Sequence, residues 1–217
     1  MRFPDARIQV FARSPEPGQT KTRLIPLLGE TGAAAFHARL VNDRLSMLTT
    51  AGLCPVELWC SPSSSTTFFQ DCRERYDVSL HDQCAGDLGM RMHHALASAL
   101  EHTEAALLVG TDCPSLGAAD IDEAFTRLQQ GIDVVLGPAH DGGYYLVGMQ
   151  QPAPALFSGI PWGSSTVFAE SVGRLEQLGL SHHCLAERMD VDTPDDYRRL
   201  DSREDGMPTG KNVVFPL

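Results

Sequence analysis

The sequence has no long hydrophobic run, no excess of basic residues and no Cys-x-x-Cys pair, and each absence excludes a class of protein. Its apolar stretches fall far below the ~18 residues that span a bilayer. A net charge of −11 argues against a nucleic-acid surface, which needs a basic stripe, but allows a small anionic ligand held by local cations. The six cysteines lack metal-ligand spacing, so we expect buried or free thiols rather than a zinc site or disulfides.

The beginning of the chain lacks the apolar core of a signal peptide, so we expect a cytoplasmic protein that does not bind membranes. A chain of 217 residues with 42% hydrophobic content fits one globular domain with a substantial core. There are no internal repeats and no linker, and no pattern indicates an oligomeric state. From residue 202 onward Gly, Pro and mixed charge occur without period. We therefore expect one domain over residues 1–201 and a poorly ordered tail over 202–217.

Short apolar runs alternate with helical patterns along the chain, which is typical of a three-layer α/β sandwich with a mostly parallel central sheet. A His-Asp-Gly-Gly turn between two of the strands favours a locally antiparallel pair there. Residues 184–191 lead to a final strand. The other expected strands are 8–12, 56–60, 78–81, 105–109, 134–137 and 144–149, and the expected helices are 31–50, 65–76, 87–102, 118–130, 166–178 and 193–200.

The most informative segment is 105–114, a short apolar run that ends in Gly-Thr-Asp-Cys-Pro. A run bounded by Gly and Pro is typical of a strand that is buried on both faces. In open α/β sheets ligands bind outside the carboxyl ends of such strands. Asp112 is therefore placed for a catalytic or metal-binding role, and the alternative is that it caps the following helix.

A loop rich in cations follows the first strand. It contains Arg13, Gly18, Lys21 and Arg23, which are our candidates for nucleotide binding. Backbone N–H groups of such a loop can approach an anion while Lys21 and Arg23 neutralise it. The loop is not a Walker A motif, which needs a second glycine directly before the lysine. We favour phosphate binding over a solvated surface loop because the segment follows the first strand of an α/β sheet.

Asp190 and Asp192 flank one residue at an expected strand end, so both side chains would project to the same face. Two carboxylates held together repel each other unless a cation or a proton separates them. Beside Asp112 they would form a hard-oxygen site for Mg²⁺ or Mn²⁺. The alternative is that Asp192 caps the next helix and Asp190 is solvated.

The segment Gly86-Asp87-Leu88-Gly89-Met90-Arg91 adds weaker candidates for nucleotide binding. Asp87 has the side chain of a good helix cap. Arg91 would then lie in the first helical turn, from which its guanidinium could reach an anion. We include Gly86, Asp87 and Arg91 in the nucleotide site on this basis.

Asp141, Tyr144 and Trp162 are candidates for the acceptor side of the site. Asp141 could activate an acceptor hydroxyl as a base, although a hairpin turn explains its Asp-Gly-Gly pattern better. Trp162 lies in a polar loop and could stack on a sugar or base, or else pack onto the core. Tyr144 follows the glycine pair, where the backbone can come close to a ligand.

Five motifs in order resemble those of the bacterial transferases of the DUF2064 group, also called rSAM/selenodomain-associated transferase 1. The motifs are Phe-Ala-Arg-x-Pro-x-x-Gly-x-x-Lys-Thr-Arg-Leu, Gly-Asp-Leu-Gly-x-Arg-Met, Gly-Thr-Asp-Cys-Pro, Asp-Gly-Gly-Tyr-Tyr-Leu and Asp-Val-Asp-Thr-Pro-Asp-Asp. The resemblance spans about residues 8–200. It implies the GT-A fold of the nucleotide-diphospho-sugar transferase superfamily, a nucleotide sugar as donor, and a divalent metal on the diphosphate. It places Lys21 and Arg23 on the nucleotide loop, Asp112 as the metal-binding acid, and Asp192 with Asp190 as the second ligand.

One motif departs from this pattern. Gly-Thr-Asp-Cys-Pro is not the Asp-x-Asp of many GT-A glycosyltransferases, and is similar to the single-Asp form of nucleotidyltransferases of the molybdenum-cofactor and phospholactate guanylyltransferase type. The latter also carry a Lys-Thr-Arg-Leu loop. We predict a metal-dependent glycosyltransferase that acts on a small-molecule acceptor, with Asp112 and Asp141 as catalytic residues. The alternatives are a nucleotidyltransferase that joins an NTP to a phosphorylated small molecule, and a nucleotide-binding module without turnover.

Overall fold

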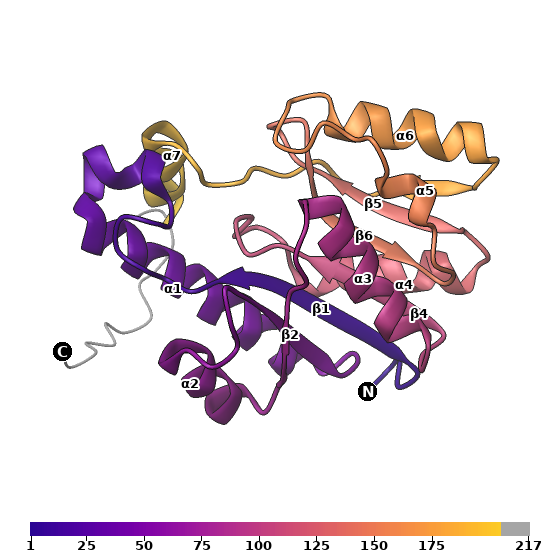
Figure 1. The fold of residues 1–217 in the computed structure, drawn as a ribbon, viewed down its shortest axis with the longest axis horizontal. Helices are drawn as coiled ribbons and strands as arrows, with labels where there is room; N and C mark the ends of the chain where they lie inside the picture. Colours follow the sequence, from indigo (N-terminus) through magenta and orange to yellow (C-terminus); the bar gives the residue numbers. More distant parts are fainter. Residues whose placement is uncertain (205–217) are drawn as a thin grey trace.

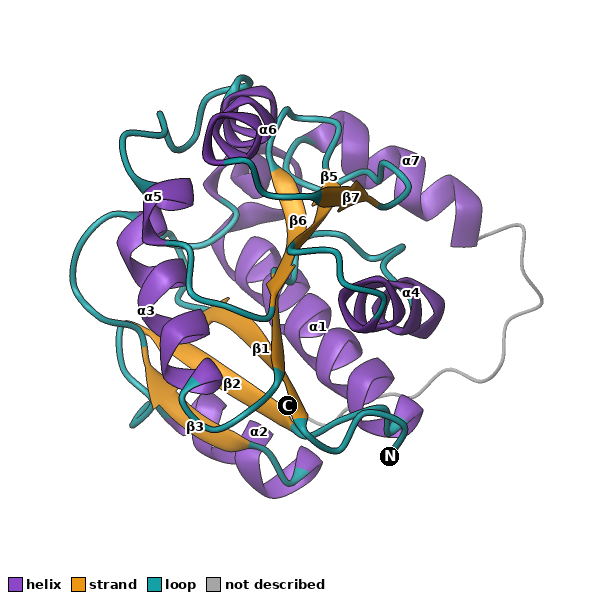
Figure 2. Ribbon diagram, turned by 90° about the vertical axis from the view of Figure 1, so that its right-hand side faces the viewer, coloured by secondary structure: helices purple, strands orange, loops and turns teal. Residues whose placement is uncertain are grey.

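A computed structural model describes residues 1–204 (Figures 1 and 2). In this part of the chain seven strands form one sheet in the order β3-β2-β1-β4-β6-β5-β7. Within the described sheet, β6 runs antiparallel to both neighbours, β4 and β5, and all other pairs are parallel. The strands are β1 Ala6–Arg13, β2 Val56–Ser61, β3 Ser79–Asp82, β4 Ala105–Val109, β5 Val134–Pro138, β6 Tyr144–Met149 and β7 His182–Cys184.

Helices cover both faces of the sheet (Figure 2). One core joins the sheet to α1, α2 and α4, and a second core joins it to α3, α5 and α6. The expected three-layer α/β sandwich with a mostly parallel sheet is therefore confirmed. The helices are the short 3₁₀ helix η1 Thr22–Leu24 and α1 Ile25–Ala51, α2 Thr67–Tyr76, α3 Leu88–Leu100, α4 Ala118–Gln129, α5 Pro154–Phe157, α6 Val167–Leu178 and α7 Pro194–Glu204.

The central strands explain why the sheet is buried on both faces. In β1 the side chains alternate, so that Ile8 and Val10 enter the core beneath α1 while Phe11 packs in the core beneath α3. All five residues of β4 are buried, as the continuous apolar run predicts. Burying each large aliphatic side chain contributes about 1.5–3 kcal/mol relative to leaving it in water. The carboxyl ends of β1 and β4 therefore occupy fixed positions side by side.

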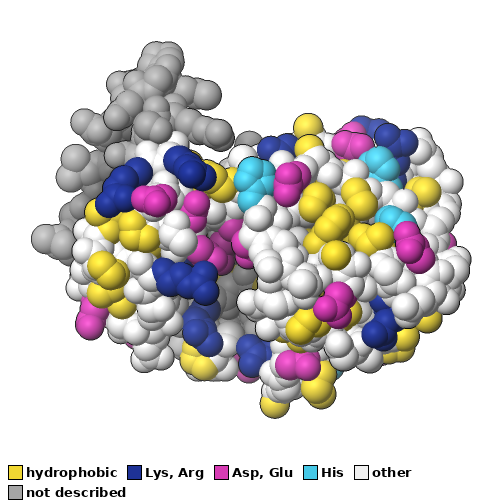
Figure 3. All heavy atoms as spheres, turned by 90° about the horizontal axis from the view of Figure 1, so that it is seen from above, with side chains coloured by type: hydrophobic (Ala, Val, Ile, Leu, Met, Phe, Trp, Pro, Cys, Tyr) yellow, Lys and Arg dark blue, Asp and Glu magenta, His cyan; other side chains and the backbone are white. Residues whose placement is uncertain are grey.

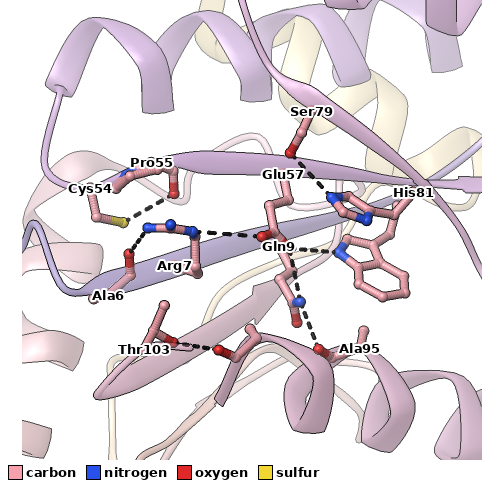
Figure 4. A network of polar contacts seen from close by, with 12 residues as sticks. Ala6, Arg7, Gln9, Cys54, Pro55, Glu57, Ser79, His81, Ala95 and Thr103 are labelled. Carbon is pink, nitrogen blue, oxygen red and sulfur yellow. Dashed lines mark hydrogen bonds and ion pairs between the residues drawn. The ribbon is translucent and has the colours of Figure 1, made fainter. Parts of the chain in front are cut away.

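A polar cluster, which we call the Glu57 cluster, interrupts this apolar packing on the α3 side of β1 and β2 (Figure 4). Glu57 Oε2 accepts hydrogen bonds from Gln9 Nε2 at 3.1 Å and Trp59 Nε1 at 3.0 Å, and Arg7 Nε lies 3.6 Å from Glu57 Oε1. Gln9, which is fully buried, also donates to the Ala95 carbonyl of α3 at 2.7 Å. The cluster therefore ties β1, β2 and α3 together.

A third, small core joins η1 and the first half of α1 to the C-terminal part of the described chain. Leu24, Phe36 and Val191 are buried together, and the ring of Tyr197 in α7 contacts that of Phe36 edge-on at 5.0 Å. In Figure 1, α7 accordingly lies beside the beginning of α1, away from most of the sheet. This small lobe carries the segment on either side of Lys21 as well as the segment that contains Asp192.

The structure corrects three of the expected elements. The helix expected at 31–50 begins at Ile25, with a backbone kink at Gly29, because η1 leads directly into it. The strand expected within 184–191 lies earlier, at His182–Cys184, and the rest of that segment makes a single bridge, Ala139 to Arg188. The last helix runs to Glu204 rather than 200, so the remainder of the expected tail, 205–217, lies outside the described residues. No helix in the described part is long and apolar enough to cross a membrane.

Candidate active site

Asp112 lies just beyond β4, at the carboxyl end of the central strands. A hydrogen bond of 2.8 Å from Val191 N to the Asp112 carbonyl fixes the segment 190–192 against this strand end. The Asp112 side chain does not cap α4, because Asp120 does so by accepting from Gly117 N at 2.9 Å. The carboxylate of Asp112 is therefore free for other contacts, and 43% of its side chain is exposed.

Lys21 connects the cation-rich loop with two acidic residues, Asp112 and Asp192. Its Nζ lies 2.7 Å from Asp112 Oδ1 and donates hydrogen bonds to Asp192 Oδ1 at 2.7 Å and to the Val191 carbonyl at 2.8 Å. Only 5% of the Lys21 side chain is exposed. Burial alone would lower the pKa of Lys21, but the charges of Asp112 and Asp192 outweigh it and raise the pKa above its usual value. Lys21, Asp112 and Asp192, which we call the Lys21 cluster, form an ion-paired group beyond the carboxyl ends of the strands.

Asp192 and Asp190 do not lie on a strand, which corrects the expected geometry. Thr193 caps α7: its Oγ1 accepts from Asp196 N at 3.3 Å, and Asp196 Oδ2 accepts from Thr193 N at 2.9 Å. Because Thr193 takes this position, Asp192 is left to bind Lys21. Asp190 Oδ1 is buried and has no hydrogen-bond partner. Burial, followed by repulsion from Asp112, raises the pKa of Asp190 to about 7.

Two cavities meet at this cluster. One, of about 330 Å³, is lined by Lys21 and Arg23, and the other, of about 320 Å³, by Arg91 and Asp190 among others; Arg13, His37 and Asp112 line both. In the space-filling view of Figure 3, Lys and Arg side chains and Asp and Glu side chains gather around a hollow. A larger cavity of about 660 Å³ lies elsewhere, between the ends of α3, α5 and α6, and none of the predicted site residues lines it. The predicted site residues therefore gather at the two smaller cavities and not at the larger one.

The sequence analysis missed His37, which comes from the buried side of α1. Its Nε2 lies 3.0 Å from the Arg13 carbonyl, and its Nδ1 is buried without a hydrogen bond, 4.0 Å from Asp112 Oδ1. Burial lowers the pKa of His37, and the charge of Asp112 offsets only part of that effect. A single histidine within an apolar helical pattern carries no motif, so spacing could not have identified it. Gln83 and Ser61, which line the second cavity, were missed for the same reason.

The segment 86–91 lies as expected at the beginning of α3. Asp87 caps the helix by accepting from Met90 N at 2.8 Å. Arg91 donates from Nε to the Gly86 carbonyl at 3.0 Å and lines the second cavity. Gly86 has φ 118°, a conformation that favours glycine, and an added Cβ would lie 2.8 Å from the Met90 sulfur. Gly18, also with positive φ, lies in the Lys21 loop but lines neither cavity.

The residues expected on the acceptor side are not brought together at the cavities. Asp141 Oδ1 accepts from Gly143 N at 2.9 Å, so the turn alternative describes its geometry. Tyr144 lines the second cavity with part of its ring, while its hydroxyl is buried. Trp162 lines neither cavity and packs against Tyr144, Phe157 and Gly89, where an added Cβ would lie 2.6 Å from the indole nitrogen.

The described residues contain no group of three His, Cys, Asp or Glu side chains arranged as a metal site. Two observations nevertheless fit a hard divalent cation. Asp190 Oδ1 is buried without a hydrogen bond, Asp112 Oδ1 faces the Lys21 ammonium, and carboxylate oxygens are the ligands that Mg²⁺ and Mn²⁺ prefer. Lys21 is the positive charge that faces Asp112 and Asp192 in this structure. The donor set therefore fits a divalent cation, provided that Lys21 moves away from the carboxylates.

The chain shares its fold with a candidate nucleotide-diphospho-sugar transferase and with a cytidylyltransferase from Leptospira borgpetersenii. A family model described as an uncharacterized protein conserved in bacteria, DUF2064, matches residues 44–164, which is more than half of the chain. The chain belongs to this family, as its motifs indicated. A comparison with curated protein sequences finds no match.

Solved structures support the same placement. A candidate nucleotide-diphospho-sugar transferase from Desulfovibrio desulfuricans G20 is 30% identical, with a TM-score of 0.83 over 91% of this chain and 86% of that one. The chain is accordingly an enzyme of the transferase class.

More distant structures share the fold alone. The 4-diphosphocytidyl-2C-methyl-D-erythritol synthase of Anaerococcus prevotii DSM 20548 is 9% identical, with a TM-score of 0.63 over 93% of this chain and 99% of that one. Glucosyl-3-phosphoglycerate synthase from Mycobacterium tuberculosis, whose structure contains Mn²⁺, UDP and glucosyl-3-phosphoglycerate, is 12% identical, with a TM-score of 0.56 over 92% of this chain and 76% of that one. The first of these enzymes is named for a diphosphocytidyl product and the second for a glucosyl product.

Proposed function

We propose that this protein transfers a sugar from a nucleotide-diphosphate sugar to a small-molecule acceptor, with a divalent cation as cofactor. The observation that carries the proposal is the meeting of Lys21 with Asp112 and Asp192 between two cavities at the carboxyl ends of the strands. Cations on one side and carboxylates on the other suit a ligand made of a diphosphate and a divalent cation. The 30% identity to the Desulfovibrio protein supports the same donor class.

In this proposal the cationic residues of the first cavity bind the diphosphate. Arg13 and Arg23 line that cavity and supply donors that match phosphate oxygens, with Lys21 as a further positive charge. Arg91 lines the adjoining cavity, where it can contact the nucleotide or the sugar. Charge that develops on the departing diphosphate is thereby stabilised by groups already in place.

Asp112 and Asp192, with Asp190 beside them, would hold Mg²⁺ or Mn²⁺. Such a cation neutralises the departing diphosphate and orients it. Asp112 is central because it lines both cavities and lies at the end of the rigid strand β4. Asp141 remains our candidate for the base that activates the acceptor hydroxyl, and Trp162 and Tyr144 for the walls on the acceptor side.

Nucleotidyl transfer is the second candidate, because the single Asp of Gly-Thr-Asp-Cys-Pro and the Lys-Thr-Arg-Leu loop also occur together in nucleotidyltransferases. The two reactions differ in their products. Transfer from a nucleotide sugar releases a nucleoside diphosphate, whereas nucleotidyl transfer from an NTP releases pyrophosphate.

A substrate panel tests both candidates. Nucleotide sugars and NTPs are first screened by thermal shift with Mn²⁺, since ligands that bind the folded state raise its melting temperature. Binders are then incubated with pooled small-molecule acceptors, and the released nucleotide or pyrophosphate is measured. We expect nucleoside diphosphate release that falls by about 10²–10³ in Asp112→Asn, the loss typical when one charge-stabilising group is removed. Pyrophosphate release from an NTP would replace the first candidate with the second, and full activity of Asp112→Asn would reject the site.

A further inference from the structure

The two roles assigned to Lys21 and to the carboxylates conflict at the atomic level. Lys21 Nζ lies 2.7 Å from Asp112 Oδ1 and 2.7 Å from Asp192 Oδ1. A magnesium ion binds carboxylate oxygens at about 2.0–2.1 Å, so an ion that used these two oxygens would lie almost where the ammonium lies. Two positive charges at such short separation repel strongly. Lys21 and a divalent cation are therefore alternative occupants of the place between Asp112 and Asp192.

The surroundings of Lys21 determine when it can leave. Its side chain is almost fully buried, and the Val191 carbonyl supplies a third acceptor at 2.8 Å. A buried ammonium that loses its carboxylates is costly unless another anion replaces them. The cavity of about 330 Å³ that Lys21 lines is also lined by Arg13 and Arg23, which can hold phosphate oxygens nearby. A diphosphate in this cavity would therefore offer Lys21 its replacement partner.

We propose that Lys21 makes binding of the divalent cation depend on binding of the nucleotide diphosphate, by exchanging Asp112 and Asp192 for the phosphates when the ligand arrives. The inference rests on the proposed function and adds an order to it. The cation binds weakly to the protein alone, and binds tightly once the diphosphate has drawn Lys21 away. Asp112 and Asp192 thus bind the cation when the nucleotide-sugar donor is present.

The first experiment measures Mn²⁺ binding to the protein alone, by electron paramagnetic resonance of free Mn²⁺. Lys21→Gln and Lys21→Met remove the competing ammonium, so we expect each to bind Mn²⁺ at least about tenfold more tightly than the wild type, within the usual range of coupling between sites. Arg23→Gln is the matched control. It removes one positive charge from the same cavity, but Arg23 forms no ion pair with Asp112 or Asp192 in the described structure. We expect it to change Mn²⁺ affinity by less than about threefold, since a solvent-exposed charge is screened by salt.

The outcomes of this experiment separate competition from general charge. Unchanged or weaker Mn²⁺ binding in the folded Lys21 variants would overturn the proposal, because it would mean that the cation does not use the place that Lys21 occupies. Equal tightening in Arg23→Gln would also overturn it, since charge anywhere in the cavity would then explain the effect. Circular dichroism and thermal melting establish that each variant is folded, and the two Lys21 variants serve as replacements for each other.

The second experiment measures the coupling itself. Mn²⁺ binding is repeated with saturating UDP, CDP or GDP, after correction for Mn²⁺ bound by the nucleotide in solution. We expect one of them to tighten Mn²⁺ binding to the wild type by about tenfold and to have a smaller effect in Lys21→Gln. A nucleotide that binds equally well with and without Mn²⁺ would overturn the coupling. If none of the three binds to any variant, the proposed function fails, while the measurement with Mn²⁺ alone still decides whether Lys21 and the cation compete.

Discussion

The Glu57 cluster lies on strands of the central sheet and the Lys21 cluster lies beyond the ends of those strands; donors outnumber carboxylates in the first, and carboxylates outnumber cations in the second. In the Glu57 cluster one carboxylate is shared by three donors, from Arg7, Gln9 and Trp59. In the Lys21 cluster one ammonium is shared by two carboxylates, and the nearby Asp190 has an oxygen without a partner. The carboxylate of the first cluster therefore has several donors, whereas the carboxylates of the second outnumber the cations that could pair with them.

This difference separates a structural role from a functional one. A buried carboxylate that is fully hydrogen-bonded holds neighbouring elements together, as Glu57 does for β1 and β2. An excess of carboxylates raises their energy until a cation or a proton arrives, and such sites are where ligands bind. The charge balance of each cluster, rather than its depth, therefore indicates what it does.

The largest effect on stability is expected from Glu57→Ala. The change would leave the buried donors of Gln9 and Trp59 without their acceptor, and each unsatisfied group costs about 1–3 kcal/mol. We expect the free energy of unfolding to fall by about 2–4 kcal/mol, as measured by urea denaturation. Glu57→Gln keeps one acceptor oxygen and should lose less. Mn²⁺ affinity should not change in the folded variant, and a change there would show that the two clusters are not independent.

A smaller and pH-dependent effect is expected from Asp190→Asn. The folded-state pKa of Asp190 is about 7, above the ordinary value of 3.8, so this group favours the folded state most below pH 4 and progressively less as the pH rises through 7. In the presence of a chelator that removes divalent cations, the stability of the wild type should therefore fall relative to that of Asp190→Asn as the pH rises from 4 to 7. Thermal melts at several pH values measure the difference. If the melting temperatures of the two proteins change in parallel with pH, the neighbouring carboxylates and burial do not raise the pKa of Asp190.

The smallest effect is expected from Thr193→Ala, which removes the hydroxyl that caps α7 beside Asp192. Loss of a helix cap costs about 1 kcal/mol, which denaturant unfolding can resolve. Thr193→Ser keeps the hydroxyl and is the matched control. If Thr193→Ala also weakens Mn²⁺ binding in the presence of nucleotide, the cap positions Asp192 as well as stabilising the helix.

The sequence was sufficient to predict the strand that precedes Asp112, but not the geometry of Asp190 and Asp192, which do not lie on a strand. The apolar run before Asp112 predicted a buried strand, and the family resemblance placed Asp112 and the loop of Lys21 in one site, where the structure brings them within 2.7 Å. Asp87 was placed correctly as a helix cap because a cap is decided by residues close in sequence. Local patterns and the topology of an α/β sheet together locate these groups.

The remaining features depend on contacts between distant segments. No local rule decides whether Asp192 or Thr193 caps α7, since both are good caps, and Lys21 is the distant partner that takes Asp192. His37 entered the site because α1 packs against the end of β1, which a helical pattern does not reveal. Trp162 was expected in a ligand site or the core, and the absence of a side chain at Gly89 lets its partly buried indole pack against the core.

The contact between Lys21 and Asp192 joins residues 171 positions apart. During synthesis, which proceeds from the N-terminus, the cationic loop and the strand of Asp112 are therefore made long before their last acidic partner leaves the ribosome. The nascent chain can form most of the sheet, since β1 to β4 lie in its first half, but it cannot complete the site. A prematurely ended chain that stops before Asp192 would carry Lys21 and Asp112 without the second carboxylate that binds Lys21, and so would differ from the whole protein in charge as well as in length.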